Sequence, residues 1–301
     1  MPRGSPFTRM CQALARPRFT GRVDLHLHTD ASDGVYKPSE LLALARKGGF
    51  AAIAITDHDT TDGALLASRL RRPGDPAVII GAELSVTWRG RDLHLLAYGV
   101  DPWQEDFRQG TAGLRERRAA RLVNGMEELR RRGLEMPDLE LPPVPGRRHL
   151  AAHLVAHGHA STLQSAIRRW LLGGAGVRLE PFGMPLEKAV TMAGGAGGFT
   201  SLAHPPEWVD RETMVALAEA GVAAIEAEYP DFSQTRILQL KSIAKDAGLK
   251  VTGGSDCHGP GPRAPGAKSL SVEQFLELGW MPNQWGLKPE EKPCWEPSGK
   301  S

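Results

Sequence analysis

The sequence has little of what marks secreted or membrane proteins. It contains three cysteines in 301 residues, an odd number set far apart at Cys11, Cys257 and Cys294, which is not the pattern of a disulfide framework. No run of 18 apolar residues occurs, and Arg and Pro interrupt the N-terminal segment where a signal peptide would be apolar. These absences argue against a membrane span and against secretion, and we expect a cytoplasmic protein.

The composition also lacks any strong bias. Apolar residues make up 41% and charged residues 24%, values close to the soluble average that exclude a disordered chain, a collagen and a coiled-coil rod. The length corresponds to about two domains of roughly 150 residues each. We therefore expect a globular protein with a substantial core, and nothing in the sequence indicates a stable protein partner.

The net charge of +2 conceals an uneven distribution. Residues 1–22 hold five Arg and no acid, residues 103–181 hold 13 Arg against 9 acids, and the rest of the chain is acidic. An acidic body suits cation binding, whereas a basic segment suits a phosphorylated ligand. The small net charge does not favour a general nucleic-acid binder.

Apolar runs of strand length alternate with helical periodicity in two stretches of the chain. The expected strands are residues 23–28, 50–56, 77–83 and 92–100 in the first stretch and 199–204, 223–228 and 249–253 in the second, and the expected helices are 38–47, 211–220 and 233–247. Alternating units of this kind build an α/β fold with a parallel sheet, either closed as a barrel or open and doubly wound.

A helical segment separates the two alternating stretches. Helical spacing runs over residues 111–132, and a proline-rich link leads to a second helical stretch that ends near residue 172. We therefore expect a small helical domain inserted into the α/β fold. The expected division is an N-terminal tail (1–21), a first part of the barrel (22–102), the helical insertion domain (103–181), a second part of the barrel (182–281) and a C-terminal tail (282–301).

Metal-ligating residue types gather at the ends of the expected strands. His26 and His28 lie two apart on one strand, so both side chains leave the same face. Residues of the same types at or near other strand ends are Asp33, His58, Glu83, His94, His204, Asp256 and His258. The C-terminal ends of parallel strands meet at one rim, and imidazole with carboxylate suits Zn²⁺, Mn²⁺ or Fe²⁺. The pattern predicts a metal cluster at that rim and favours a barrel.

Three further residues near these strand ends could serve the same site in other ways. Asp57 and Asp59 are expected to orient metal ligands or to cap the following turn. Cys257 could act as a nucleophile, but strand alternation points it away from Asp256 and His258. We expect no catalytic role for this thiol.

The motifs DLHLHTDASDG, AITDHDTTDG, IGAE, HLLAYG, LAHP and GSDCH, in this order, resemble those of the PHP (polymerase and histidinol phosphatase) superfamily of metal-dependent phosphoesterases. The resemblance covers residues 22–102 and roughly 182–270. The helical insert resembles that of the RNase AM/TrpH-like branch, which contains 3′,5′-nucleoside bisphosphate phosphatases. This resemblance implies a distorted (β/α)₇ barrel with a trinuclear metal centre, in which manganese, or else zinc, iron or magnesium, is bound.

The resemblance also implies which residues hold each ion. The first metal would take His26, His28, Glu83 and Asp256; the second would share Glu83 and take His94 and His204; the third would use Asp33, His58 and His258. Divalent ions lower the pKa of a bound water, so a metal-activated hydroxide would attack the phosphate without a protein nucleophile.

Substrate contacts are expected from the basic insert. Arg118 and Arg121 lie one helical turn apart, where the family's helix carries phosphate-binding arginines, although a solvated helix face would show the same spacing. Arg147 and His149 fall in a stretch that resembles a G-R-P-H sequence of relatives. Arg178 and Phe232 depart from the family pattern, which leaves their effect on specificity open.

Three functions are compatible with this sequence. The first is hydrolysis of phosphate from nucleotides of the 3′,5′-bisphosphate (pAp) type, with 5′-nucleotidase activity or 5′–3′ trimming of short RNA 5′ ends beside it. The second is a histidinol-phosphatase-like phosphomonoesterase, whose small cationic substrate would gain nothing from the insert's arginines. The third is a non-catalytic PHP module that acts in trans with a nucleic-acid enzyme.

Overall fold

The computed structural model describes residues 21–172 and 176–279. The expected terminal tails, 1–21 and 282–301, fall almost wholly outside these described residues. None of the helices in the described ranges is long and apolar enough to cross a membrane.

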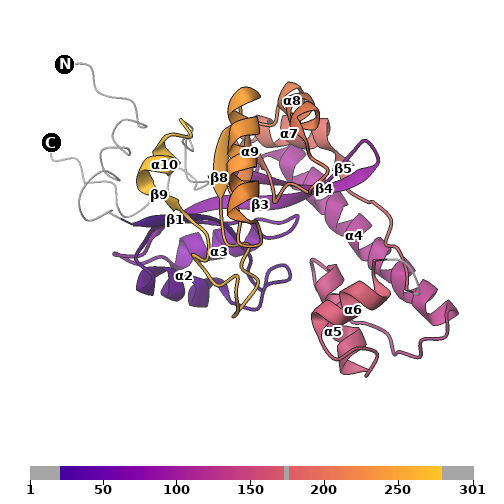
Figure 1. The fold of residues 1–301 in the computed structure, drawn as a ribbon. Helices are drawn as coiled ribbons and strands as arrows, with labels where there is room; N and C mark the ends of the chain where they lie inside the picture. Colours follow the sequence, from indigo (N-terminus) through magenta and orange to yellow (C-terminus); the bar gives the residue numbers. More distant parts are fainter. Residues whose placement is uncertain (1–20, 173–175, 280–301) are drawn as a thin grey trace, which may run out of the picture.

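A single sheet, nearly closed into a barrel, forms the centre of the molecule (Figure 1). Its strands are β1 (Arg22–Leu27), β2 (Phe50–Ile55), β3 (Ala77–Trp88), β4 (Arg91–Tyr98), β5 (Met184–Pro185), β6 (Phe199–Leu202), β7 (Ala224–Glu228), β8 (Lys250–Gly253) and β9 (Leu270–Ser271). They lie in the order β8-β7-β6-β4-β3-β2-β1-β9, with β5 on β3. The two sides of the sheet meet where Leu27 forms a parallel bridge with Cys257. The prediction of an α/β barrel is confirmed.

Two strands depart from the expected parallel sheet: the short β9 is antiparallel to β1, and β4 is the larger exception. β4 is antiparallel to both of its neighbours, β3 and β6. β3 does not end at Glu83 but continues to Trp88, and Arg89 and Gly90 then turn the chain back with φ values of 49° and 74°. Two consecutive left-handed residues match the twist of a hairpin, which is why a two-residue turn suffices here. His94, near the start of β4, is thereby brought to the rim that holds Glu83.

Helices cover the outside of the sheet. They are α2 (Pro38–Lys47), α3 (Asp62–Leu70), α7 (Leu186–Gly195), α8 (Arg211–Glu219) and α9 (Gln234–Asp246), with α10 (Val272–Leu276) beside β1 and β9. α2 shows the local reasons: Pro38 opens the helix, Glu40 reaches back to the Lys37 N–H, and Leu41 and Leu42 are buried against the strands. These helices leave one rim of the sheet for the site.

The helical insert extends away from the barrel (Figure 1). α4 (Glu105–Arg131) begins against the barrel, and α5 (Arg147–Ala156) and α6 (Leu163–Trp170) pack on its far half. The three helices share an apolar cluster of their own, to which Leu122, Leu150 and Ala166 contribute. The near half of α4 remains in contact with the barrel, which places the α5 N-terminus beside the rim.

Candidate metal centre

The structure brings all nine predicted ligand residues to one rim of the barrel. Their positions are His26 on β1, His28 and Asp33 after it, His58 after β2, Glu83 on β3, His94 on β4, His204 after β6, and Asp256 and His258 after β8. Most of these side chains are buried. Residues more than 200 positions apart in the sequence thus line one cluster.

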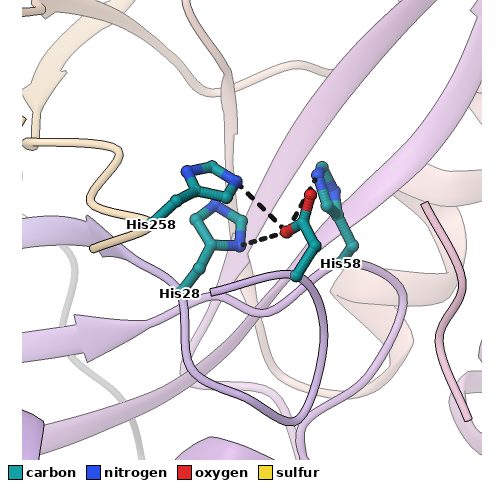
Figure 2. A group of neighbouring side chains, drawn as sticks. His28, His58 and His258 are labelled. Carbon is teal, nitrogen blue, oxygen red and sulfur yellow. Dashed lines mark ion pairs between the residues drawn. The ribbon is translucent and has the colours of Figure 1, made fainter. Parts of the chain in front are cut away.

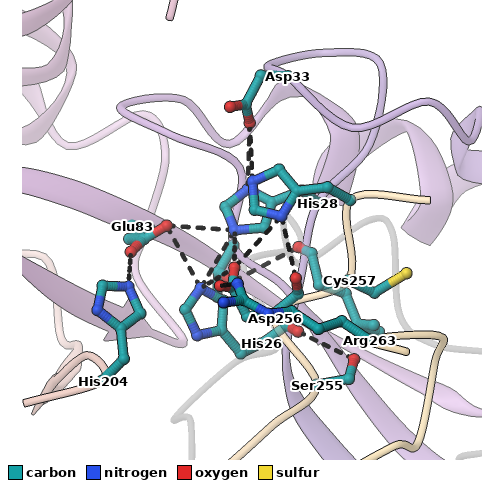
Figure 3. Close-up of polar contacts among 12 residues, drawn as sticks. His26, His28, Asp33, Glu83, His204, Ser255, Asp256, Cys257 and Arg263 are labelled. Carbon is teal, nitrogen blue, oxygen red and sulfur yellow. Dashed lines mark hydrogen bonds and ion pairs between the residues drawn. The ribbon is translucent and has the colours of Figure 1, made fainter. Parts of the chain in front are cut away.

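The first group surrounds the Nε2 atoms of His26 and His28, which lie 3.1 Å apart (Figure 3). Glu83 Oε2 lies 3.3 Å from the first of these nitrogens and 3.2 Å from the second. Asp256 Oδ1 lies 3.4 Å and 3.2 Å from the same two atoms. Each of the four residues thus directs one ligand atom at a shared point.

The second group consists of Asp33 and the three histidines that Figure 2 labels, His28, His58 and His258. Asp33 Oδ1 lies 3.1 Å from His258 Nε2, 3.9 Å from His58 Nε2 and 4.0 Å from His28 Nδ1. His28 therefore faces this group with one ring nitrogen and the first group with the other.

Glu83 joins the first group to a third. Its Oε1 lies 2.7 Å from His94 Nδ1 and 3.0 Å from His204 Nε2, while His58 Nδ1 approaches its other oxygen at 3.2 Å. The carboxylate thus has ligand atoms on two sides, which suits a position between two ions.

The cluster has the polar atoms that a metal site requires. Four buried atoms in it make no hydrogen bond: His28 Nδ1, Asp33 Oδ1, His58 Nδ1 and Glu83 Oε2. Buried polar atoms are normally hydrogen-bonded, and leaving them unpaired is costly. Cations coordinated by these atoms would remove that cost, and imidazole with carboxylate is a donor set for first-row divalent ions. The residues present therefore fit metal ions.

The charges of the cluster also favour cations. Burial would raise the pKa of Glu83, but the imidazoles of His94, His58 and His26 outweigh burial and hold it well below its usual value. Neighbouring histidines likewise outweigh burial and hold the pKa values of Asp33 and Asp256 well below theirs. All three groups are carboxylates at neutral pH.

When no ion is bound, the pKa values of two histidines are raised, whereas those of the carboxylates are lowered. Burial disfavours a charge on His26, but the carboxylates of Glu226, Glu83 and Asp256 raise the pKa of its imidazole well above the usual value. Burial acts on His28 in the same sense, and the carboxylates of Asp256 and Glu83 raise its pKa to about 10. In the absence of an ion, protons on these two imidazoles balance the negative charge of the carboxylates.

The rim also contains strained backbone. Asp59, His204 and Asp256 have φ values of 51°, 27° and 49°, in the left-handed region that non-glycine residues rarely adopt. Such residues cluster at functional sites, where surrounding contacts hold them. At His204 the contact is a hydrogen bond of 2.9 Å from its N–H to Glu226.

Asp57 and Asp59 accept hydrogen bonds from residues that lie close to the proposed ligands in the sequence. Asp57 accepts hydrogen bonds from the N–H and hydroxyl of Thr29 and from the hydroxyl of Ser32, in the loop that leads to Asp33. Asp59 accepts from the N–H and hydroxyl of Ser85. Neither belongs to a group of converging ligand atoms.

Sequence reasoning missed several residues behind the ligands. Tyr229 donates its hydroxyl to Asp256 Oδ2 at 2.8 Å, and Arg263 donates to the same oxygen at 2.5 Å (Figure 3). Glu226 accepts from His26 and His204. An acidic residue inside the predicted strand 223–228 could have identified Glu226 from the sequence. Arg263 lies in a loop, where no sequence pattern indicated its role.

The insert places a group of arginines beside the metal cluster. Arg118 is buried and donates to Asp59 Oδ2 at 2.9 Å and to the Ser85 hydroxyl at 2.7 Å. Arg121 donates to Asp92 Oδ2 at 3.0 Å and to a backbone carbonyl. Both guanidinium groups lie over the ring of Phe182.

The first turn of α5 supplies the rest of this group. Arg147 is exposed, and the ring of His149 accepts the Gly146 N–H at Nδ1. Arg148, which sequence reasoning passed over, lies 4.0 Å from Asp33. The two departures from the family pattern have partners of their own: Arg178 forms an antiparallel β-bridge with Leu172, and the ring of Phe232 packs on Tyr229.

Comparison with known proteins decides the family. A family model, the PHP domain, matches residues 24–132. The chain is 31% identical to the 3′,5′-nucleoside bisphosphate phosphatase of Chromobacterium violaceum over 251 residues, which is 79% of this chain and 88% of that one. The chain belongs to the PHP family of phosphoesterases. The predicted resemblance is confirmed, and with it the prediction of a metal-dependent hydrolase of phosphoric esters.

Other relatives match along nearly their whole length. The 5′-3′ exoribonuclease Rnm of Salmonella typhimurium is 30% identical over 286 residues, 90% of this chain and 97% of that one. Among solved structures, a candidate metal-dependent phosphoesterase of Bifidobacterium adolescentis superposes with a TM-score of 0.76 at 26% identity, covering 85% of this chain and 94% of that one. The likeness therefore includes the helical insert as well as the barrel.

Proposed function

We propose that this PHP protein removes a phosphate from 3′,5′-nucleoside bisphosphates of the pAp type, with short RNA 5′ ends as a second substrate. The observation that carries the proposal is the group of four arginines, Arg118, Arg121, Arg147 and Arg148, which the insert places beside the metal cluster. Metal ions at the cluster account for hydrolysis of one phosphate. The arginines account for a second phosphate on the same substrate.

Arg121 indicates that this group is built for an anion. Its Nε is buried and makes no hydrogen bond among the described residues. Burial, and then the positive charges of Arg147 and Arg118, lower the pKa of Arg121 to about 10, although Asp92 acts against them. A bound phosphate would use the unpaired donor and offset the repulsion between the arginines.

The α5 N-terminus adds donors close to the metal cluster. A Cβ at Gly146 would lie 3.4 Å from an Arg118 nitrogen and 3.5 Å from Asp33 Oδ2, so the helix begins directly beside the second group of ligands, which surrounds Asp33. Because His149 accepts the Gly146 N–H at Nδ1, its neutral ring carries the proton on Nε2 and can donate to a phosphate. Free N–H groups at a helix N-terminus favour the same ligand.

We propose that the nine rim residues hold three divalent ions per chain, with manganese as the first candidate. When bound, such ions neutralise phosphate oxygens and activate water. The protein itself orients the ligands and holds the second phosphate with Arg148 and His149. Among the described residues it offers no thiol nucleophile to compete with water. Cys257 is buried in the core and its thiol pKa is raised by burial to about 11, so it is not a nucleophile at neutral pH.

The proposal also assigns roles to the parts of the chain. Residues 103–181 would form the substrate-binding domain, and 22–102 with 182–281 the catalytic barrel. A free thiol at Cys257 suits a reducing cytoplasm. A histidinol-phosphatase-like activity would use the same ions, but the arginines would repel the ammonium group of its substrate.

A substrate panel tests the proposal. Manganese-loaded protein is assayed with pAp, 5′-AMP, histidinol phosphate and 5′-phosphorylated RNA oligomers. We expect the highest kcat/KM with pAp, at least about tenfold above 5′-AMP, since one charge-assisted hydrogen bond contributes about 1.5–3 kcal/mol. A higher kcat/KM with histidinol phosphate, or no turnover of any compound, would contradict the proposal.

A matched pair of variants locates the second phosphate. Arg148→Ala should raise KM for pAp about tenfold and leave KM for 5′-AMP nearly unchanged. Arg168→Ala, which removes an exposed arginine from α6 in the same insert, should change neither value. Equal effects of both variants would mean that only the general positive charge of the insert matters.

A further inference from the structure

Glu226 is a buried carboxylate for which the proposed reaction has no direct use. It lies on β7 and is 0% exposed. Its Oε1 lies 2.9 Å from His26 Nδ1, and its Oε2 accepts the His204 N–H at 2.9 Å. The ion pairs of the described residues give it no lysine or arginine partner. Both of its partners are residues that we propose as metal ligands.

In the neutral ring that binds an ion, the contact of His26 with Glu226 determines which ring nitrogen carries the proton. A carboxylate only accepts hydrogen bonds, so Nδ1 must be the donor. The Nε2 lone pair is then left for a cation, and this atom is the one that faces Glu83 and Asp256 at 3.3 and 3.4 Å. A ring with its proton on Nε2 could not coordinate an ion there.

The contact with His204 acts on the backbone. His204 has a φ of 27°, a costly conformation that needs support from its surroundings. Glu226 supplies that support at the N–H, and the side chain then reaches Glu83 with Nε2 at 3.0 Å. One carboxylate therefore orders two histidines that come from different strands, His26 on β1 and His204 after β6.

We propose that Glu226 is a positioning residue of the metal centre: its two oxygens set the tautomer of His26 and the backbone of His204, so that both imidazoles present a nitrogen to the ions. The inference rests on the metal centre proposed above. Two acceptors are required, because both partners are donors. A glutamine in its place has one acceptor and one donor, so its NH₂ would oppose either the His204 N–H or the His26 Nδ1–H.

Manganese binding tests this role. Calorimetric titration of the metal-free protein with Mn²⁺ should give an affinity about 10- to 100-fold weaker for Glu226→Gln than for wild type. Glu226→Asp keeps two acceptors and should recover part of the loss. Glu228→Gln is the matched control, because Glu228 lies on the same strand but pairs with Lys241 and Lys268; it should bind Mn²⁺ as wild type does. Wild-type affinity in Glu226→Gln would overturn the inference.

A spectroscopic measurement covers the case in which the variants fail to fold. In zinc-loaded wild-type protein with ¹⁵N-labelled histidine, long-range ¹H–¹⁵N correlations report which ring nitrogen bears a proton. The His26 signals are assigned by their loss in His26→Gln. We expect a proton on Nδ1 and none on Nε2; the opposite pattern would overturn the inference.

His26→Ala separates this inference from the proposal beneath it. If that variant binds Mn²⁺ as tightly as wild type, the proposed metal centre is wrong. If it loses Mn²⁺ while Glu226→Gln does not, the centre stands and only the role of Glu226 fails.

Discussion

Carboxylates at the rim divide their two oxygens between different partners. Asp256 directs Oδ1 at the imidazoles, while Oδ2 accepts from Tyr229 and Arg263. Glu83 directs Oε1 at His94 and Oε2 at His26. With one oxygen held or shared in this way, each carboxylate keeps a defined orientation toward an ion instead of rotating freely.

Proton release on metal binding follows from the histidine shifts. His26 and His28 have raised pKa values and are protonated near pH 7 in the metal-free protein, but only the neutral ring coordinates an ion. Binding of Mn²⁺ must therefore displace protons, and the apparent affinity should rise with pH between about 6 and 8. Calorimetry in buffers of different ionisation enthalpy measures the protons directly. An affinity independent of pH would contradict these shifts.

The thiol of Cys257 should be inert. It is buried, with a pKa raised to about 11, and its sulfur points away from the ligands (Figure 3). In the native protein at pH 8, peptide mapping after iodoacetamide treatment should show little modification of Cys257, and full modification after denaturation. Cys257→Ala should keep kcat within about threefold of wild type. A much larger loss of kcat with an unchanged melting temperature would restore the nucleophile hypothesis.

At the scale of elements, α4 connects the insert to the barrel through buried charge. Arg118 pairs with Asp59 at 2.9 Å, and Arg115 donates to the Asp59 carbonyl. Asp59 follows His58 directly in the sequence. The insert is thus tied to the loop that carries a proposed ligand, so docking of α4 and the geometry of the metal cluster depend on the same residues.

Breaking this pair should destabilise the protein. Arg118→Ala leaves Asp59 buried without its cation, which costs about 3–5 kcal/mol in comparable pairs. Urea unfolding of the metal-free protein should show a loss of that size. Arg148→Ala, at a half-exposed site, should change the free energy of unfolding by less than about 1 kcal/mol. Equal stability of the two variants would show that Arg118 is no anchor.

At the scale of the whole molecule, the metal cluster joins segments from both halves of the barrel. His28 and Asp33 follow β1, whereas Asp256 and His258 follow β8, across the place where the sheet closes. Ions that bind only the folded cluster should therefore stabilise the entire barrel.

Metal removal measures this stabilisation. Mn²⁺ at a hundredfold excess over Kd should stabilise the chelator-treated protein by about 2.7 kcal/mol per site, which corresponds to a rise of roughly 5 °C or more in Tm. The same titration of Asp256→Asn, followed by calorimetric or optical melting, should give a smaller rise. An identical rise in that variant would mean that the stabilising ions bind elsewhere.

The sequence by itself determined the class of the fold and the chemistry of the site. Alternating strand and helix periods predict an α/β fold with a parallel sheet, and histidines and acids at strand ends predict a metal cluster and favour the barrel, because these patterns depend on spacing along one covalent chain. The His26 and His28 spacing is the clearest case: two residues apart on a strand, they share a face whatever surrounds them.

Only the tertiary structure decided which groups meet across the chain. The hairpin that reverses β4, the contact between Glu226 and His26 over 200 residues, and the burial of Arg118 against Asp59 all depend on how strands register and helices dock. Arg118 and Arg121 lie one helical turn apart, and the sequence does not distinguish their roles. In the structure Arg118 anchors the insert to Asp59, whereas Arg121 has no partner at Nε among the described residues. Local spacing fixes the direction of a side chain, whereas packing of distant segments selects its neighbour.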